Sequence, residues 1–332
     1  MGNIFEGIMN FIYIPFGLIF RLLYSLVNNY GIAILLFAVL SKVCMLPLSI
    51  KTEKSRIRMQ AIQPKAEELK KKYKGDTTNP KYTEEMQKLY AANGTSMTGG
   101  CGWQFLQLPI IWAIWNAIRN PITYLWDISS NEHILSIARH LFNNGVDLGV
   151  TVKSGSTVAN TLSSWIGSHQ ISLMSLIESN REMVSDLLPS NCPNINIRFL
   201  GLDLGVLPSW TSWTLLIPVI SGVTSFLVGF LSQRLMTKKN KTASVDGATR
   251  NSMNLLLYIM PVVSVVIGFS FNVAIGLYWI LSNLLSIAQT YFVHWYVDRK
   301  EEKLEAERAL QKKNRNKKKK NHTQTEDSSS GT

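Results

Sequence analysis

The sequence predicts an all-α, polytopic membrane protein with five transmembrane helices around a polar groove and a cytoplasmic helical hairpin. Charged residues make up 17% of the 332 residues and hydrophobic residues 46%, whereas about 25% of a soluble domain is charged. Residues 251–297 form a 47-residue run without Asp, Glu, Lys or Arg, and a helix needs only ~20 residues to cross a bilayer. These observations exclude a soluble globular enzyme, and three scattered cysteines exclude a disulfide scaffold.

The five spans follow from the uncharged runs. We expect them at the following positions: residues 29–50, 102–125, 210–233, 253–270 and 272–297. The first contains Lys42 and the second contains Arg119 near its far end. The long uncharged run folds as two spans that turn near Phe269–Asn272, because one helix of that length would overshoot the bilayer more than twofold.

The first 28 residues predict an amphipathic helix lying along the membrane interface. Its uncharged run, Gly7 to Phe20, is too short to span comfortably. The following apolar residues recur at spacings of three, four or seven: Phe5, Ile8, Ile12, Ile19, Leu23 and Leu26. A signal peptide is the alternative, although no basic segment precedes the run and no A-x-A-like site follows it.

Four further segments connect or follow the spans. Residues 51–101 are polar and basic and predict two amphipathic helices joined by a turn at 75–80, a cytoplasmic hairpin. The alternative is a plain connector, although a connector would be much shorter. Residues 126–209 form an extracytoplasmic loop without recognisable site chemistry, residues 234–252 a cytoplasmic loop, and residues 298–332 a charged tail that continues the last helix through Leu310.

The basic residues of the connecting segments set the orientation. Residues 51–101 carry 11 basic and 6 acidic residues, and residues 125–213 carry 4 and 7. Residues 234–250 carry 5 and 1, and residues 298–332 carry 11 and 7. This alternation predicts a cell-membrane protein with its N-terminus outside and its C-terminus in the cytoplasm. Cys44, Cys101 and Cys192 then fall in a span, at the inner face and outside, so we expect no intramolecular pair.

Lys42 is the most informative single residue. It lies ~16 Å along the first span from Gly31, near the bilayer midplane, where a lysine costs at least ~2.5 kcal/mol. Snorkelling to the inner end, ~12 Å away, is the alternative to a hydrated cavity. Polar residues on other spans could line such a groove: Gln104, Gln107, Ser221, Thr224, Ser225, Ser282, Asn283, Ser286 and Gln289. Any one of these sets could also serve interhelical bonding.

Catalytic and cofactor motifs are missing from the sequence. The five histidines lack metal-ligand spacing, and no nucleotide-binding or zinc-protease motif occurs. We therefore expect no enzyme, no cofactor and no metal site. A small-solute transporter or channel with Lys42 as its binding charge remains the alternative function, although no internal repeat supports it. A structural scaffold would not need a buried cation.

Several short motifs resemble one known family. They are Met59-Gln60-Ala61-Ile62-Gln63-Pro64, Lys72-Tyr73-Lys74-Gly75-Asp76, Lys88-Leu89-Tyr90, Gly100-Cys101, Gln107-Leu108-Pro109-Ile110, Pro261, Gly276-Leu277-Tyr278-Trp279, Ser282-Asn283 and Gln289. In this order they resemble the YidC/Oxa/Alb membrane protein insertases, particularly the short Gram-positive bacterial type. The resemblance covers about residues 29–124 and 200–297.

The resemblance implies a five-span insertase core whose groove opens to cytoplasm and lipid. It places the groove charge at Lys42, where the family usually has arginine, and client contacts at Tyr82, Met86 and Trp279. Gly102-Trp103 stand where the family commonly has proline after the Gly-Cys pair. The implied partners are nascent membrane proteins and the phospholipid bilayer, with the Sec translocon as a further candidate.

The tail contains a dense run of basic residues. Seven of the nine residues from 312 to 320 are basic: Lys312, Lys313, Arg315, Lys317, Lys318, Lys319 and Lys320. Such a run is usually a solvated flank, or one held by anionic lipid at ~1 kcal/mol per residue. The alternative is contact with ribosomal RNA phosphates, which basic tails of some family members make.

Overall fold

The computed structural model describes residues 2–94, 102–152, 155–190, 192–239, 259 and 261–329, and the side chains of 2–10, 102–108 and 311–329 are among those outside this description. Its helices and strands are α1 Gly2–Val27, α2 Tyr30–Lys72, α3 Pro80–Ala92, α4 Gly102–Arg119, α5 Pro121–Leu125, α6 Asn131–Asn143, α7 Val158–Ser179, η1 Arg181–Leu187, β1 Arg198–Phe199, β2 Leu202–Asp203, η2 Trp213–Leu215, α8 Leu216–Lys239 and α10 Val273–Ser329. Residues 261–268 are also helical.

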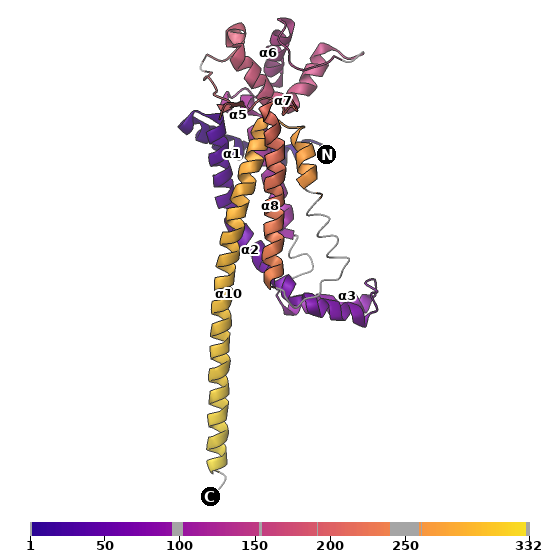
Figure 1. Cartoon of the computed structure of the whole chain (residues 1–332), viewed down its shortest axis with the longest axis vertical. Coiled ribbons are helices and arrows are strands. Elements are labelled where there is room, and N and C mark those ends of the chain that lie inside the picture. The colour runs from indigo at the N-terminus through magenta and orange to yellow at the C-terminus, as the bar shows by residue number, and fades with distance from the viewer. Residues whose placement is uncertain are drawn as a thin grey trace.

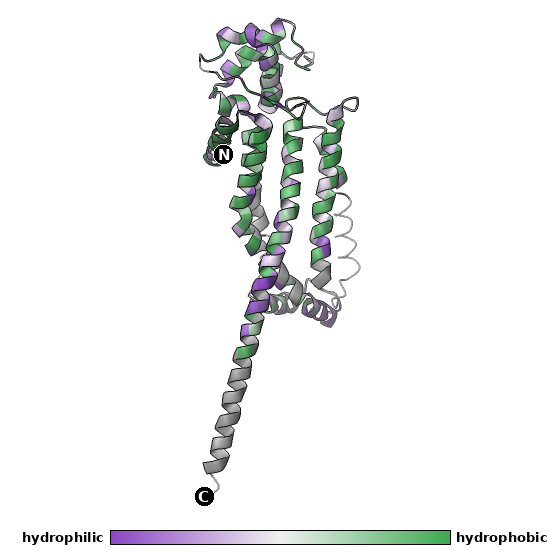
Figure 2. Ribbon diagram, turned by 60° about the vertical axis from the view of Figure 1, so that its left-hand side comes forward, coloured by the Kyte–Doolittle hydropathy of each residue, from purple (hydrophilic) through white to green (hydrophobic). Residues whose placement is uncertain are grey.

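The long helices form a bundle with a different structure at each end (Figure 1). Helices α6 and α7 lie at one end, which we call the loop end, and α3 lies at the other, which we call the hairpin end. Helix α10 packs on both α2 and α8 and then extends past the bundle toward the C-terminus. The part of each helix within the bundle is predominantly hydrophobic (Figure 2).

Three helices in the described part of the chain are long and apolar enough to cross a membrane. They are Tyr30–Ser55, Trp213–Leu235 and Val273–Leu304, and a shorter apolar helix covers Phe11–Val27. The fold is therefore an all-α membrane protein with several spans. Of the fourth predicted span, 253–270, only residue 259 and residues 261–270 are described, and a turn at 269–270 separates them from α10.

Helix α2 begins at an asparagine pair and runs farther than the sequence predicts. Asn28 adopts a left-handed backbone (φ 49°), which asparagine tolerates better than most residues. The Asn29 side chain then caps α2 by accepting a hydrogen bond from the Ile32 amide at 3.1 Å. The helix continues for 43 residues, so the first span and the first hairpin helix are one element. Pro47 and Pro64 lie inside it.

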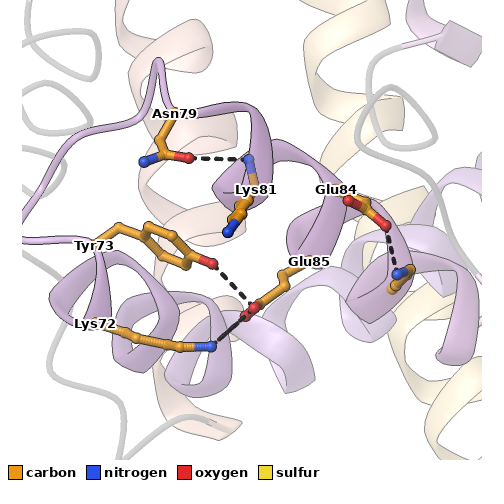
Figure 3. Close-up of polar contacts among 7 residues, drawn as sticks. Lys72, Tyr73, Asn79, Lys81, Glu84 and Glu85 are labelled. Atoms are coloured by element: carbon orange, nitrogen blue, oxygen red, sulfur yellow. Dashed lines mark hydrogen bonds and ion pairs between the residues drawn. The ribbon is translucent and has the colours of Figure 1, made fainter.

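The hairpin turn uses residues suited to tight turns. Gly75 has φ +83°, and the Asn79 side chain accepts from the Lys81 amide at 3.0 Å to cap α3 just before Pro80. Glu85 on α3 accepts hydrogen bonds from Lys72 at 2.8 Å and from the Tyr73 hydroxyl at 3.0 Å (Figure 3). These bonds hold α3 against the end of α2.

Helix α1 is apolar on two sides. Phe20 and Tyr24 are buried, with Ile19 and Leu23 packed beside them. The opposite stripe is exposed and lies at Phe11, Ile14, Leu18, Leu22 and Leu26. Part of the apolar pattern seen in the sequence therefore faces protein, because the helix has enough apolar residues to supply both a packing face and an exposed face.

The buried residues of the segment between residues 126 and 209 belong to the same hydrophobic core as those of the bundle. We call this segment the loop domain. Ile134, Ile137 and Leu141 of α6 pack with buried residues of α7. A two-stranded antiparallel sheet pairs Arg198 with Asp203, the only sheet in the described residues and one that the all-α prediction did not include.

Buried hydrogen bonds join the loop domain to the bundle. Asn272, 3% exposed, donates to the Ser172 hydroxyl at 2.7 Å and to the Gly205 carbonyl at 2.6 Å. The Ala274 amide donates to the Leu204 carbonyl at 3.0 Å. The start of α10 is thus fixed by the loop domain. At its other end α10 continues to Ser329, beyond the predicted helix end at Leu310.

Candidate functional site

Polar side chains of α2 and α10 meet along the line where these helices pack. Lys42 Nζ donates to Ser286 Oγ at 2.7 Å, and Gln289 Nε2 donates to Ser49 Oγ at 2.9 Å. A third contact, between Glu53 and His294, lies farther along both helices. We call these three contacts the first, second and third levels. We call Lys42, Ser49, Glu53, Ser282, Ser286, Gln289 and His294 the polar seam.

Lys42 contacts a hydroxyl group rather than a carboxylate. Ser286 Oγ donates its own hydrogen to the Ser282 carbonyl at 2.7 Å, so its lone pairs are oriented to accept from Lys42. Among the ion pairs of the described residues, none joins a carboxylate to Lys42. The side chain is half-buried in a membrane-spanning segment. An acidic group entering the seam would therefore find an unpaired positive charge.

Asn283 lies on another side of α10 and contacts α8. Its amide nitrogen donates to Ser225 Oγ at 2.8 Å, to Thr224 Oγ1 at 3.1 Å and to the Ser221 carbonyl at 3.4 Å. Thr224 Oγ1 in turn bonds the Ile220 carbonyl at 2.9 Å. The polar residues predicted on α8 thus join α8 to α10, which is the interhelical role that the sequence left open.

The third level of the seam contains residues that the sequence analysis missed. His294 Nδ1 lies 3.3 Å from Glu53 Oε1, and His294 Nε2 lies 3.2 Å from Asp298 Oδ2. The i, i+4 spacing of His294 and Asp298 was a detectable signal. The pairing with Glu53 was not, because it depends on the register between α2 and α10.

The expected client contacts lie in different environments. Trp279 packs edge-on against Trp115 of α4, with ring centroids 6.2 Å apart. Tyr82 packs against Tyr73 within the hairpin at 5.8 Å. Met86 is buried between the hairpin helices, 6% exposed, so a client reaches it only if α3 moves away from α2.

Other predicted site residues lie outside the described part. Gln104 and Gln107 belong to α4, but their side chains are not described. The same holds for Lys312, Lys313, Arg315 and Lys317–Lys320 of α10. Cys44 and Cys192 are free thiols, and Cys101 lies outside the described residues. In the described residues, no group of His, Cys, Asp or Glu could hold a metal ion.

Comparison with known proteins identifies the family. Residues 22–301 match the family described as 60Kd inner membrane protein. The chain is 26% identical to the Bacillus anthracis "Membrane protein insertase YidC 2" over 269 residues, covering 80% of this chain and 72% of that protein. It is 27% identical to the Alkalihalophilus pseudofirmus "Membrane protein insertase YidC" over 294 residues, 86% of this chain and 82% of that protein.

A third relative extends the same pattern. The Bacillus subtilis "Membrane protein insertase MisCA" is 25% identical over 268 residues, 80% of this chain and 70% of that protein. The family match covers most of the chain and includes the whole polar seam. The chain therefore belongs to the 60Kd inner membrane protein family, that of the YidC/Oxa/Alb insertases which its motifs resemble.

Proposed function

We propose that this protein is a membrane protein insertase that moves hydrophobic segments of nascent clients into the bilayer through a positively charged, hydrophilic groove. Five spans surround this groove, the N-terminus lies outside, and the hairpin and C-terminus lie in the cytoplasm. The relatives named as insertases support the function. The single observation that carries the mechanism is Lys42, whose ammonium group bonds the Ser286 hydroxyl and forms no ion pair with a described carboxylate.

The polar seam lowers the cost of carrying a polar flank across the membrane. A short acidic flank that enters beside Lys42 exchanges bulk water for the ammonium and hydroxyl groups of the seam, which offsets part of its desolvation. The Ser282 and Gln289 side chains lie on the same side of α10 as Ser286 and supply further polar partners. The hydrophobic segment then leaves sideways into lipid, driven by burial of its apolar surface.

The hairpin receives the client before it reaches the seam. Lys72 and Glu85 form an exposed ion pair, and exposed pairs contribute at most ~1 kcal/mol. This pair therefore adds little to the cost of opening α3, most of which comes from exposing Met86, and opening would uncover Tyr82 and Met86 for a hydrophobic client segment. Deleting residues 63–88 and bridging the gap should reduce client crosslinking, while unchanged insertion kinetics would reduce the hairpin to a connector.

In this proposal the basic tail, and the Sec translocon as a further partner, help to deliver clients to the protein. Residues 312–320 would contact ribosomal RNA phosphates, with anionic lipid as the competing partner. Because phosphate contacts release counterions, ribosome binding should weaken steeply with salt. Truncation after Leu310 should flatten this dependence. Equal cosedimentation of truncated and intact protein at every salt concentration would exclude the ribosome contact.

Reconstitution into liposomes tests the function itself. Insertion of a purified single-span client with an acidic flank should require the protein and should survive Lys42→Arg. Lys42→Glu should lower the insertion rate at least tenfold, which corresponds to ~1.4 kcal/mol. Arg234→Glu is a matched control because Arg234 lies outside the seam, over the Phe230 ring. Protein-independent insertion, or equal rates for Lys42→Glu and the control, would contradict the proposal.

A further inference from the structure

We propose that an apolar pocket at the loop end of the bundle binds one acyl chain of a membrane phospholipid. The cavity has a volume of about 550 Å³, within the ~300–1,000 Å³ of small-molecule sites. The β1–β2 turn, η2 and the first turns of α8 and α10 line it, and every lining residue is apolar or glycine. A hydrocarbon chain fits such a lining, whereas a polar ligand would lose its hydrogen bonds there.

The pocket faces away from the polar seam. On α10 its lining residues are Val273, Leu277 and Ile280, whereas the seam uses Ser282, Ser286 and Gln289. At 3.6 residues per turn, these two sets point in directions about 180° apart. The pocket therefore lies on the outer wall of the bundle, separate from the proposed path of the client.

The surface around the pocket is apolar and suited to contact with lipid. Exposed apolar residues continue from the pocket along α8, from Leu216 and Ile220 to Val223 and Leu227. Another exposed stripe continues along α10 through Leu284 and Tyr291. The pocket is thus continuous with the surface that contacts the hydrocarbon of the bilayer.

The rim of the pocket matches the level of the lipid headgroups. Leu200 at the turn between the strands is 83% exposed, and Trp213 of η2 is 80% exposed. Tryptophan is enriched where membrane spans reach the interface. A chain of a phospholipid in this leaflet could enter beneath Leu200 and Trp213 while its headgroup stays at the interface.

The floor of the pocket is preformed by backbone contacts. The Val273 amide donates to the Val206 carbonyl at 2.9 Å, and α8 approaches α10 so closely that a Cβ on Gly276 would lie 2.3 Å from Ile217 Cγ2. Ile217 and Val273 are buried, 7% and 0% exposed. A fixed floor distinguishes this pocket from the transient spaces between annular lipids, because little ordering cost remains when a chain binds.

Photocrosslinking in nanodiscs tests the site. The intact protein is reconstituted with a phosphatidylglycerol probe that carries a diazirine in one acyl chain, and labelled positions are located by peptide mass spectrometry. We expect labelling at 199–204 and 273–280 to exceed that of the exposed stripe at 227–230. Ile220→Trp, which fills the mouth, should reduce pocket labelling about tenfold, equivalent to ~1.4 kcal/mol. Val223→Trp is the matched control, since it adds the same ring to the same helix outside the lining.

Three results would overturn the proposal. Equal labelling of the pocket and the 227–230 stripe would reduce the contact to annular lipid. Unchanged pocket labelling in Ile220→Trp and in a second filling variant, Leu216→Trp, would exclude a specific chain in the cavity. A client with the same diazirine in its hydrophobic segment that labels these residues and displaces the lipid would make the pocket a client site.

Discussion

At the loop end of the bundle, Asn272 is 3% exposed and makes two hydrogen bonds, whereas at the hairpin end Lys72 and Glu85 meet with side chains 60% and 38% exposed. Removing a partner from a buried hydrogen bond costs ~1–3 kcal/mol, while an exposed ion pair contributes at most ~1 kcal/mol. The polar contacts at the loop end are thus buried and strong, whereas the polar contact at the hairpin end is exposed and weak. The proposed mechanism uses this difference, because in it the seam keeps its geometry while clients enter from the hairpin end.

The largest expected effect on stability is at Asn272. Asn272→Ala removes both donations to the loop domain and should destabilise the protein by about 2–3 kcal/mol. The expected decrease in melting temperature in detergent is roughly 4–12 °C. Asn144→Ala is the control, because Asn144 is exposed and bonds only its own helix, at the His140 carbonyl. Equal melting temperatures for the two variants would mean that the buried Asn272 bonds stabilise the loop end no more than an exposed side-chain bond does.

A smaller effect is expected where β1 packs on the start of α2. A Cβ on Gly31 would lie 2.2 Å from Phe199 Cγ, so Gly31→Ala should cost about 1–2 kcal/mol through overpacking. Gly167→Ala is the matched control, since nothing lies within 4 Å of its added Cβ. Chemical denaturation in detergent measures both. A neutral Gly31→Ala would show that the loop domain shifts easily and that the loop end is not firmly held.

The smallest effect on global stability is expected at the hairpin, where the readout is local opening. Glu85→Gln removes the negative charge that pairs with Lys72 and weakens the hydrogen bonds from Lys72 and Tyr73, so amide exchange of α3 should accelerate while the melting temperature stays the same. Glu84→Gln is the control, because Glu84 pairs with Lys88 inside α3. Accelerated exchange in both variants, or in neither, would show that hairpin opening does not depend specifically on the Lys72–Glu85 contact.

The same contact gives a pH dependence. The hydrogen bond from Lys72 lowers the pKa of the Glu85 carboxyl below its ordinary value of 4.5, and the bond to Glu85 raises the pKa of Lys72 above 10.5. Because its pKa is lowered in the folded hairpin, ionised Glu85 stabilises the closed hairpin at pH values above 4.5. This stabilisation is lost as the pH falls through the lower pKa of the folded state. Because its pKa is raised, protonated Lys72 stabilises the closed hairpin at pH values below 10.5, and this stabilisation is lost at higher pH. The protection of the α3 amides, taken relative to the intrinsic exchange rate at each pH, should therefore be constant from about pH 5 to 10 and should fall below about pH 4.5.

Uncharged runs were sufficient to predict α2, α8 and α10, and turn residues such as Gly75 and Asn79 were sufficient to predict the hairpin turn. The continuity of α2 was not predictable, since a change from apolar to charged residues, as at Lys51, does not by itself fix where a helix ends. The β1–β2 sheet was missed because each strand has two residues, too few for a period of two to appear.

The sequence predicted which face of α10 carries the polar residues of the seam, but not which residues they contact on other helices. Spacing placed Ser282, Ser286 and Gln289 on one side of α10, and membrane depth identified Lys42. Which helix each side of α10 faces depends on tertiary packing. The sequence therefore predicts Asn283 as a groove residue, whereas in the structure Asn283 bonds α8. Spacing alone does not place His294 in the seam, because its contact with Glu53 depends on the register between α2 and α10.

The most direct test of the groove charge is a charge-swap insertion assay. Two single-span clients are made that differ only in the flank, one acidic and one with lysine at the same positions, and each is inserted by the wild-type protein and by Lys42→Glu in liposomes. The account predicts that Lys42→Glu loses the acidic client and gains the lysine client, so that the preference reverses. The same loss of both clients in Lys42→Glu, or no preference in either protein, would contradict the electrostatic role of Lys42.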